Sequence, residues 1–249
     1  MRFFNHKYYL NMKKLSIILF LAGFLLSTVN LNAQLLKDAK KFVQQKSGGL
    51  TEKDAADAIK EALVNGTGEA VKFVSNPDGY FKNPEIKIPF PEDAKVVESK
   101  LRAVGLGSKV DEVILSINRA AEDAGKEAKP IFVSAVKNMS IKDAVNIVKG
   151  ENNAATMYLK QSSSGELNTK FQPVIKASLD KVNATKYWED LIKAYNRIPM
   201  VQKMNPNLTQ YVTSKAIEGL FLMVAKEELK IRKDPKAQTT ALLKKVFGK

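Results

Sequence analysis

Hydrophobic residues recur with helical spacing along most of the chain from about residue 51 onward. Residues 51–54 (TEKD) resemble a capping box with Asp at the fourth position. Ile59, Ala62 and Leu63 then follow the spacing that places apolar side chains on one face of a helix. A helix is therefore predicted from this cap to about Val74.

The same periodicity predicts further helices down to the C-terminus. Their approximate ranges are 92–105, 109–124, 131–136, 140–150, 152–162, 166–182, 186–196, 207–225 and 235–249. Ser108, Ser140, Asn207 and Asp234 are the expected N-caps of four of them. Only residues 86–88 (IKI) alternate as a strand would, and there is no repeat of solenoid length. The predicted fold class is all-α, an irregular or orthogonal multi-helix bundle.

One long segment, residues 75–92 (SNPDGYFKNPEIKIPFPE), interrupts the helical pattern. It contains four of the chain's nine prolines, together with Gly79. Proline and glycine at this density exclude a continuous helix and predict a long irregular loop. A loop of this length is uncommon in a compact domain and is often functional.

The N-terminus has the order of a secretory signal peptide. Lys13 and Lys14 precede an apolar run over residues 15–26, and Asn32-Ala33-Gln34 offers a small residue before a cleavage point. We expect residues 1–33 to be the signal peptide, with Met12 as an alternative start. The run is shorter than the roughly 20 residues that span a bilayer. The predicted location is therefore the periplasm or the outer-membrane surface, and the protein is not expected to be an integral membrane protein.

Removal of this segment limits the chemistry of what remains. His6 is the only histidine and the chain has no cysteine, so the exported portion would contain neither residue. Four of the 40 basic residues and none of the 26 acidic residues lie in 1–33, which leaves a formal net charge of +10. An exported basic protein meets anionic lipid, polysaccharide or acidic partners rather than nucleic acid. The alternative is that the lysines only form a hydrated surface and bind no partner.

The remaining residues divide into two parts. Residues 34–49 form a short lysine-rich amphipathic stretch, expected to be an N-terminal helix or a tether, with peripheral contact to an anionic membrane as another possibility. Residues 50–249 are predicted to form a single helical domain. Its oligomeric state is not indicated by the sequence.

Three polar residues on one helix are the main candidates for a site. Asn118 and Glu122 stand at i and i+4, and Arg119 and Glu122 at i and i+3, close enough to pair. An arginine held by a glutamate can still present its planar fork to a carboxylate or phosphate. One interpretation is therefore a small recognition site. The other is a polar network that fastens this helix to the 75–92 loop by satisfying the loop's backbone groups.

Four further residues complete the candidate ligand-binding set: Asp78 and Asn83 in the loop, and Glu69 and Tyr158 in helices. Paired carboxylates can hydrolyse glycosides without His or Cys, so Asp78, Glu69 and Glu122 are the acids to consider for that chemistry. No nucleophile motif, phosphate-binding loop or calcium-loop spacing is present. We therefore predict no catalytic residues, no metal and no cofactor.

Several strings of the sequence resemble bacterial envelope proteins of domain-of-unknown-function family 4197. The similar strings are residues 77–80 (PDGY), 83–91 (NPEIKIPFP), 118–122 (NRAAE), 154–158 (AATMY) and 242–247 (LLKKVF). They occur in order from about residue 50 to residue 248. The resemblance implies an exported helical protein, and it brings no established activity with it. The end of the signal segment also resembles those of Bacteroidetes exported proteins.

Three functions are compatible with these observations. The first is an envelope protein that binds an apolar or anionic ligand (a small molecule or lipid), or a protein partner, without catalysis, through the 75–92 loop and the face of Asn118, Arg119 and Glu122. The second is a structural or assembly protein of the envelope. The third is a carboxylate-dependent hydrolase. We expect a non-enzymatic role.

Overall fold

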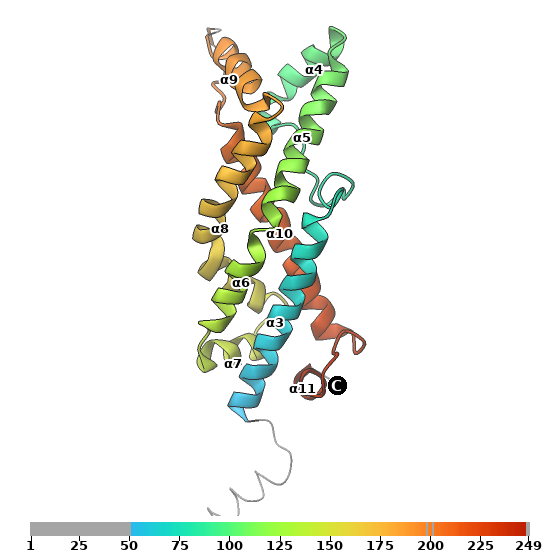
Figure 1. Ribbon diagram of the computed structural model, residues 1–249, viewed down its shortest axis with the longest axis vertical. Helices are drawn as coiled ribbons and strands as arrows, with labels where there is room; N and C mark the ends of the chain where they lie inside the picture. The colour runs from blue at the N-terminus through green and yellow to red at the C-terminus, as the bar shows by residue number, and fades with distance from the viewer. Residues whose placement is uncertain (1–50, 198, 201, 248–249) are drawn as a thin grey trace, which may run out of the picture. The chain divides into compact units, whose positions relative to one another are not determined.

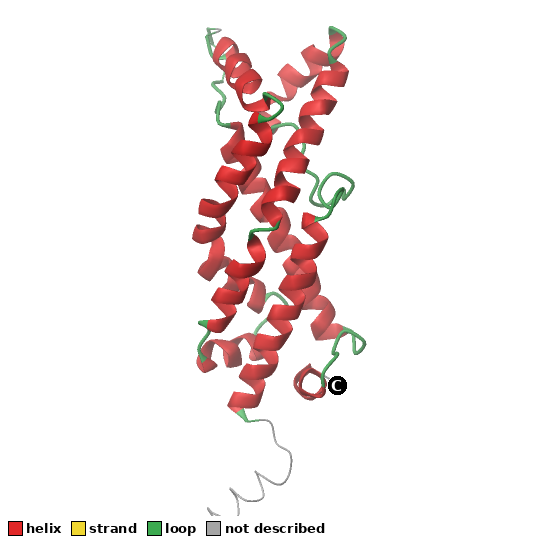
Figure 2. Ribbon diagram, viewed as in Figure 1, coloured by secondary structure: helices red, strands yellow, loops and turns green. Residues whose placement is uncertain are grey.

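The computed structural model describes residues 51–197, 199–200 and 202–247. The chain divides into two units, Met1–Gly49 and Leu50–Lys249, and the described residues belong to the second. The predicted signal peptide and the 34–49 segment lie outside the described residues. Within the described ranges every regular element is a helix, so the all-α prediction is confirmed (Figure 2).

The helices are joined mostly by short connections (Figure 1). Their bounds are α3 Glu52–Ser75, η1 Glu92–Ala94 (a 3₁₀ turn), α4 Lys95–Ala103, α5 Gly107–Gly125, α6 Ala128–Lys137, α7 Ile141–Lys149, α8 Ala154–Asp180, α9 Ala184–Tyr195, α10 Leu208–Lys233 and α11 Ala241–Phe247. The long helices α3, α5, α8 and α10 form most of the bundle in Figure 1, and the shorter α6 continues from α5 and packs beside α3 and α8. No helix in the described ranges has the length and apolarity needed to cross a bilayer.

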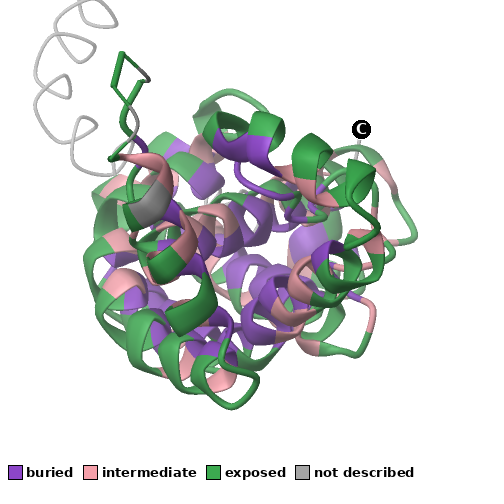
Figure 3. Ribbon diagram, turned by 90° about the horizontal axis from the view of Figure 1, so that it is seen from above, coloured by how far each residue is buried: buried purple, intermediate pink, exposed green. Residues whose placement is uncertain are grey.

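The core lies where α5, α8, α10 and α3 meet, and buried residues face inward in Figure 3. α8 illustrates how the sequence builds it. Its fully buried residues recur at helical spacing, so one face packs against the neighbouring helices while the other meets water. They are Leu159, Leu167, Phe171, Ile175 and Leu179.

Capping side chains set several helix starts as the sequence predicts. Thr51 and Asp54 form a reciprocal capping box at α3, and Ser140 forms the equivalent box at α7. Asn207 accepts a hydrogen bond from a backbone N–H of the first turn of α10. Ser108 does not cap: α5 begins at Gly107 and has no side-chain cap.

Several helix boundaries differ from the sequence prediction: α10, for example, continues to Lys233 and does not end near residue 225. The ranges 152–162 and 166–182 form one continuous helix, α8, which passes through Gly165 and Pro173. Both residues face solvent, and the buried side chains on the other face hold the helix together against a proline cost of about 3 kcal/mol. The last helix begins at Ala241 and not at Pro235, because residues 234–240 form turns and Thr240 accepts the N–H of Leu243.

Residues 76–91 form the long irregular connection between α3 and η1. Ile86, Ile88 and Phe90 are buried, whereas Lys87 and Pro89 between them are exposed. This alternation is that of an extended chain with one face against a core. The segment forms no strand within the described structure, since its partners are helices.

Candidate functional site

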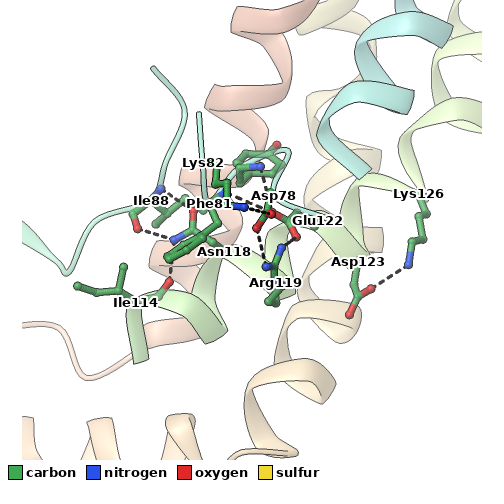
Figure 4. Close-up of polar contacts among 11 residues, drawn as sticks. Asp78, Phe81, Lys82, Ile88, Ile114, Asn118, Arg119, Glu122, Asp123 and Lys126 are labelled. Carbon is green, nitrogen blue, oxygen red and sulfur yellow. Dashed lines mark hydrogen bonds and ion pairs between the residues drawn. The ribbon is translucent and has the colours of Figure 1, made fainter. Parts of the chain in front are cut away.

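Asn118 of α5 forms hydrogen bonds with the backbone of the loop, as a neighbouring strand would (Figure 4). Its Oδ1 accepts the N–H of Ile88 at 2.8 Å, and its Nδ2 donates to the C=O of Ile88 at 2.8 Å. Nδ2 also donates to the C=O of Ile114, one turn earlier in α5, at 2.7 Å. Asn118 is fully buried, so these bonds satisfy polar groups that water cannot reach. One amide thus fixes both the position and the direction of the loop.

Glu122, one turn further along α5, binds the other end of the loop. Its Oε1 accepts the N–H of Tyr80 at 3.1 Å and the N–H of Phe81 at 3.2 Å. Its Oε2 accepts a hydrogen bond from Arg119 Nη1 at 2.6 Å. The carboxylate is buried, and a buried carboxylate needs such partners. The i, i+4 spacing of Asn118 and Glu122 therefore holds two points of the loop on one helix face.

Arg119 links this helix to the start of the loop. Its Nη2 donates to Asp78 Oδ1 at 2.6 Å, while Nη1 binds Glu122. Asp78 has a φ of 69°, in the left-handed region that non-glycine residues seldom adopt, and its Oδ2 forms an ion pair with Lys82 at 2.8 Å. We call Asp78, Asn118, Arg119 and Glu122 the loop clamp.

Hydrogen bonds among the charged residues around the loop clamp favour the charged forms of Asp78 and Arg119. Hydrogen bonds from Lys82 and then Arg119 lower the pKa of the Asp78 carboxyl. Hydrogen bonds to Glu122 and then Asp78 raise the pKa of the Arg119 guanidinium. The side chain of Arg119 is 40% exposed and lies over the ring of Phe81, 5.7 Å from its centroid. Two of its five donors make the contacts described.

The loop is also seated on α10. Tyr80 is fully buried, and its hydroxyl donates to the C=O of Ala216 at 2.6 Å. Burial raises the pKa of this phenol well above its usual range. The ring lies against Gly219, where an added Cβ would come within 2.8 Å of Tyr80 Cε1 and 3.1 Å of Ile86 Cβ. Glycine at this position is therefore required for the close approach of the loop.

The structure brings together four of the seven candidate residues. The other three lie elsewhere. Asn83 accepts the N–H of Glu85 within the loop, and Tyr158 of α8 donates to the C=O of Ala135 at 3.4 Å. Glu69 is exposed on α3 and lines a separate groove. Asp78 and Glu122 converge on one arginine, and Glu69 does not join them.

That groove has a volume of about 950 Å³ and does not include the loop clamp residues in its lining. It runs along α3 from Val64 to Ser75, a rise of about 16 Å. The end of α10, the turn after it, the α5–α6 junction and Leu243 of α11 supply the rest of the lining. We call it the lysine groove, after the five lysines that line it: Lys72, Lys126, Lys129, Lys230 and Lys236.

Three acids also line the lysine groove, namely Glu69, Glu227 and Asp234, so lysines outnumber them by two. Lys126 pairs with Asp123 outside the lining, and Lys230 pairs with Glu227 at 3.5 Å. The other three lysines form no ion pair with any residue that the structure describes. Those three are Lys72, Lys129 and Lys236. Among the described residues, the groove thus holds three lysines without an ion pair beside two acids, Glu69 and Asp234, that form none either.

Sequence reasoning missed a second buried carboxylate, Glu228 of α10. It accepts the backbone N–H groups of Ala155 and Thr156 at 3.0 and 2.8 Å, and so caps the start of α8. Arg232 pairs with it at 2.9 Å and donates to the C=O of Ile147. A detectable signal exists: Glu228 interrupts the apolar stripe of α10 one turn after Val224. A charged residue in such a stripe indicates a paired, buried group.

In the described ranges no three His, Cys, Asp or Glu side chains gather as metal ligands would. The fold and the loop clamp together define an all-α bundle protein in which one helix face anchors a long loop. The chain belongs to a family described as protein of unknown function (DUF4197), whose model matches residues 49–248. This confirms the resemblance noted in the sequence. No curated protein and no solved structure matches the chain.

Proposed function

We propose that this protein is exported to the cell envelope and binds an anionic ligand in the lysine groove without catalysing a reaction. Export is supported by the N-terminal residue pattern. The observation that supports ligand binding is a groove of about 950 Å³ in which three lysines have no acidic partner among the described residues. Lysines outnumber acids by two in this lining, and an excess of positive charge on a concave surface attracts an anion.

The lysine groove is a better candidate than the loop clamp because its polar groups are available. Asn118 Oδ1 and Glu122 Oε1 accept backbone N–H groups of the loop, and Glu122 Oε2 accepts from Arg119, which leaves them a fastening role. Arg119 has the most exposed side chain of the loop clamp, and its two ion-pair contacts are to Glu122 and Asp78. In the groove, by contrast, Lys72, Lys129 and Lys236 can each direct their three donors at a ligand.

Lysine also indicates what kind of anion fits. The groove lining contains no arginine, so it offers compact point charges and no planar fork for bidentate binding. Such a site selects by charge and position rather than by the geometry of one carboxylate. Phosphate-bearing and carboxylate-bearing ligands are both of the right class.

Native mass spectrometry of the protein purified from its own envelope tests this proposal. We expect a bound molecule in the wild type that is lost from the variant Lys72→Gln/Lys129→Gln/Lys236→Gln. The matched control Lys137→Gln/Lys170→Gln/Lys186→Gln removes the same charge from exposed positions outside the groove and should keep the molecule. A wild-type protein without any bound molecule, or equal loss in both variants, would contradict the proposal.

A further inference from the structure

The apolar side chains most exposed to water lie in two turns between helices. Met200, in the connection between α9 and α10, is fully exposed, and Val104, in the turn between α4 and α5, is 71% exposed. They are the two most exposed large hydrophobic side chains in the part of the chain that the structure describes. Leu106, in the same α4–α5 turn, is 45% exposed. We call Val104, Leu106 and Met200 the apolar tips.

A contact between aromatic rings shows how these two turns come to lie at one end of the bundle. Phe90, just before η1 and α4, packs edge-on against Trp188 of α9, with ring centroids 5.3 Å apart. From this point α4 and α9 both extend towards the end of the bundle that is uppermost in Figure 1. The two turns that carry the apolar tips follow these helices directly. Apolar residues gathered at one place, unlike single ones scattered over a surface, indicate contact with a protein or a membrane.

The backbone of both turns is in the left-handed region. Gly105, between Val104 and Leu106, has a φ of 85°, which glycine adopts without strain. Met200 has a φ of 65°, which non-glycine residues seldom adopt. A fully exposed side chain gains no packing that could offset this backbone cost. The fold alone therefore does not account for a methionine at this position.

Positive charge accompanies the apolar tips. Residues 98–112 and 196–204 contain five basic and three acidic residues. All three acids form ion pairs, with Arg102 or Lys109. The other three cations are exposed and form no ion pair with any residue that the structure describes. They are Lys100, Arg197 and Lys203. The charge left over beside the tips is complementary to an anionic surface.

We infer that the apolar tips and these three cations dock the protein on the surface of an anionic membrane. The tips enter the boundary between headgroups and acyl chains, and the cations stay at the level of the lipid phosphates. A lipid surface fits this arrangement because two separate turns can both enter a flat, fluid layer. Each cation near an anionic surface tightens binding by about fivefold. The docking surface shares no residue with the lysine groove.

Vesicle sedimentation tests this inference with residues 34–249, the chain expected after export. Binding to phosphatidylcholine vesicles with about 30% phosphatidylglycerol should be more than about tenfold tighter than to phosphatidylcholine alone, and should weaken as salt is added. Val104→Asn/Met200→Asn should weaken it by at least about tenfold. Both positions are exposed, and asparagine tolerates a positive φ, so the variant should keep its fold.

Matched controls separate the apolar tips from exposed apolar residues in general. Ile141→Asn/Met157→Asn changes exposed residues on α7 and in the first turn of α8, and should leave vesicle binding unchanged. Lys100→Gln/Arg197→Gln/Lys203→Gln should weaken binding to the anionic vesicles by more than about tenfold. The groove variant Lys72→Gln/Lys129→Gln/Lys236→Gln removes the same charge and should bind these vesicles nearly as the wild type does.

A fluorophore reports which end of the bundle meets the lipid. The protein has no cysteine, so Gln202→Cys carries a single label beside Met200, and Asn146→Cys carries the control label on α7. Anionic vesicles should shift the emission of the first label to shorter wavelength and leave that of the second unchanged.

The outcomes are independent of the lysine groove. Wild-type protein that does not bind anionic vesicles would overturn the inference, whether or not it binds a protein of the envelope. Equal binding by the wild type and the Val104→Asn/Met200→Asn variant would also overturn it, because the contact would then lie elsewhere on the chain. An equal response of the two labels would have the same meaning. Anion binding in the groove is tested separately by the groove variant.

Discussion

Replacing Asn118 by alanine tests the most specific contact in the fold. The change removes the side chain that pairs both backbone groups of Ile88. Each buried polar group left unpaired costs about 1–3 kcal/mol, so the free energy of unfolding should fall by about 2–5 kcal/mol. This is a large part of the roughly 5–15 kcal/mol that stabilises a typical domain.

Asn118→Asp separates hydrogen bonding from size. The isosteric carboxylate can still accept the N–H of Ile88, but its second oxygen would face the carbonyl oxygens of Ile88 and Ile114, to which Nδ2 now donates. At pH 7 we expect a loss at least as large as for alanine. Burial raises the pKa of the introduced carboxyl above its unfolded value of about 3.9. The protonated form is therefore favoured in the fold, and the defect should shrink as pH falls towards that unfolded value and grow as pH rises through the folded pKa.

Urea unfolding followed by tryptophan fluorescence measures both variants. Trp188 is the only tryptophan, and its ring lies 5.3 Å from that of Phe90, so it reports on the end of the loop. Hydrogen exchange at the amide of Ile88 reports local opening. Asn146→Ala, at an exposed position of α7, is the control and should change stability by less than about 0.5 kcal/mol. A loss below about 1 kcal/mol for Asn118→Ala, with Ile88 still protected, would refute the reasoning.

Three further predictions follow from the same contacts. Gly219→Ala should lower the free energy of unfolding by about 1–3 kcal/mol, because the added methyl group meets the Tyr80 ring. Gly68→Ala has open space around it and should raise the free energy of unfolding by about 0.5–1 kcal/mol. Thermal unfolding of the two variants compares these effects. The lowered pKa of Asp78 means that its stabilisation is present above its unfolded pKa of 3.8 and is lost as pH falls through the lower folded pKa, so Asp78→Asn should flatten the acid limb of a stability-against-pH curve. Glu228→Ala should lower the free energy of unfolding by about 3–5 kcal/mol, because it leaves Arg232 buried without its carboxylate. Chemical denaturation measures this loss, and a clearly smaller loss would contradict the prediction.

Much of the helical architecture could be predicted from the sequence because it follows from periodicity and caps. Thr51, Ser140 and Asn207 mark helix starts by side-chain chemistry that acts within one turn. The course of α8 could not be read in this way. Pro173 disfavours a helix locally, and the packing that overrides it comes from helices distant in the sequence.

The candidate site was predictable to a similar degree. The spacing of Asn118, Arg119 and Glu122 places them on one face, and the fastening interpretation agrees with the bonds they form to the loop. The lysine groove was not predictable, because Lys72, Lys129 and Lys236 come from three separate parts of the chain. Their proximity depends on how α3, α6 and the turn after α10 pack together.

The central claim is that the three groove lysines hold a ligand in the envelope. Lysine acetylation footprinting measures this directly, by comparing protein in isolated envelopes with the same chain refolded free of envelope components. Lys72, Lys129 and Lys236 should react more slowly in the envelope, relative to Lys137, Lys170 and Lys186, and at a comparable rate in the refolded protein. Equal relative rates in both preparations would contradict the account.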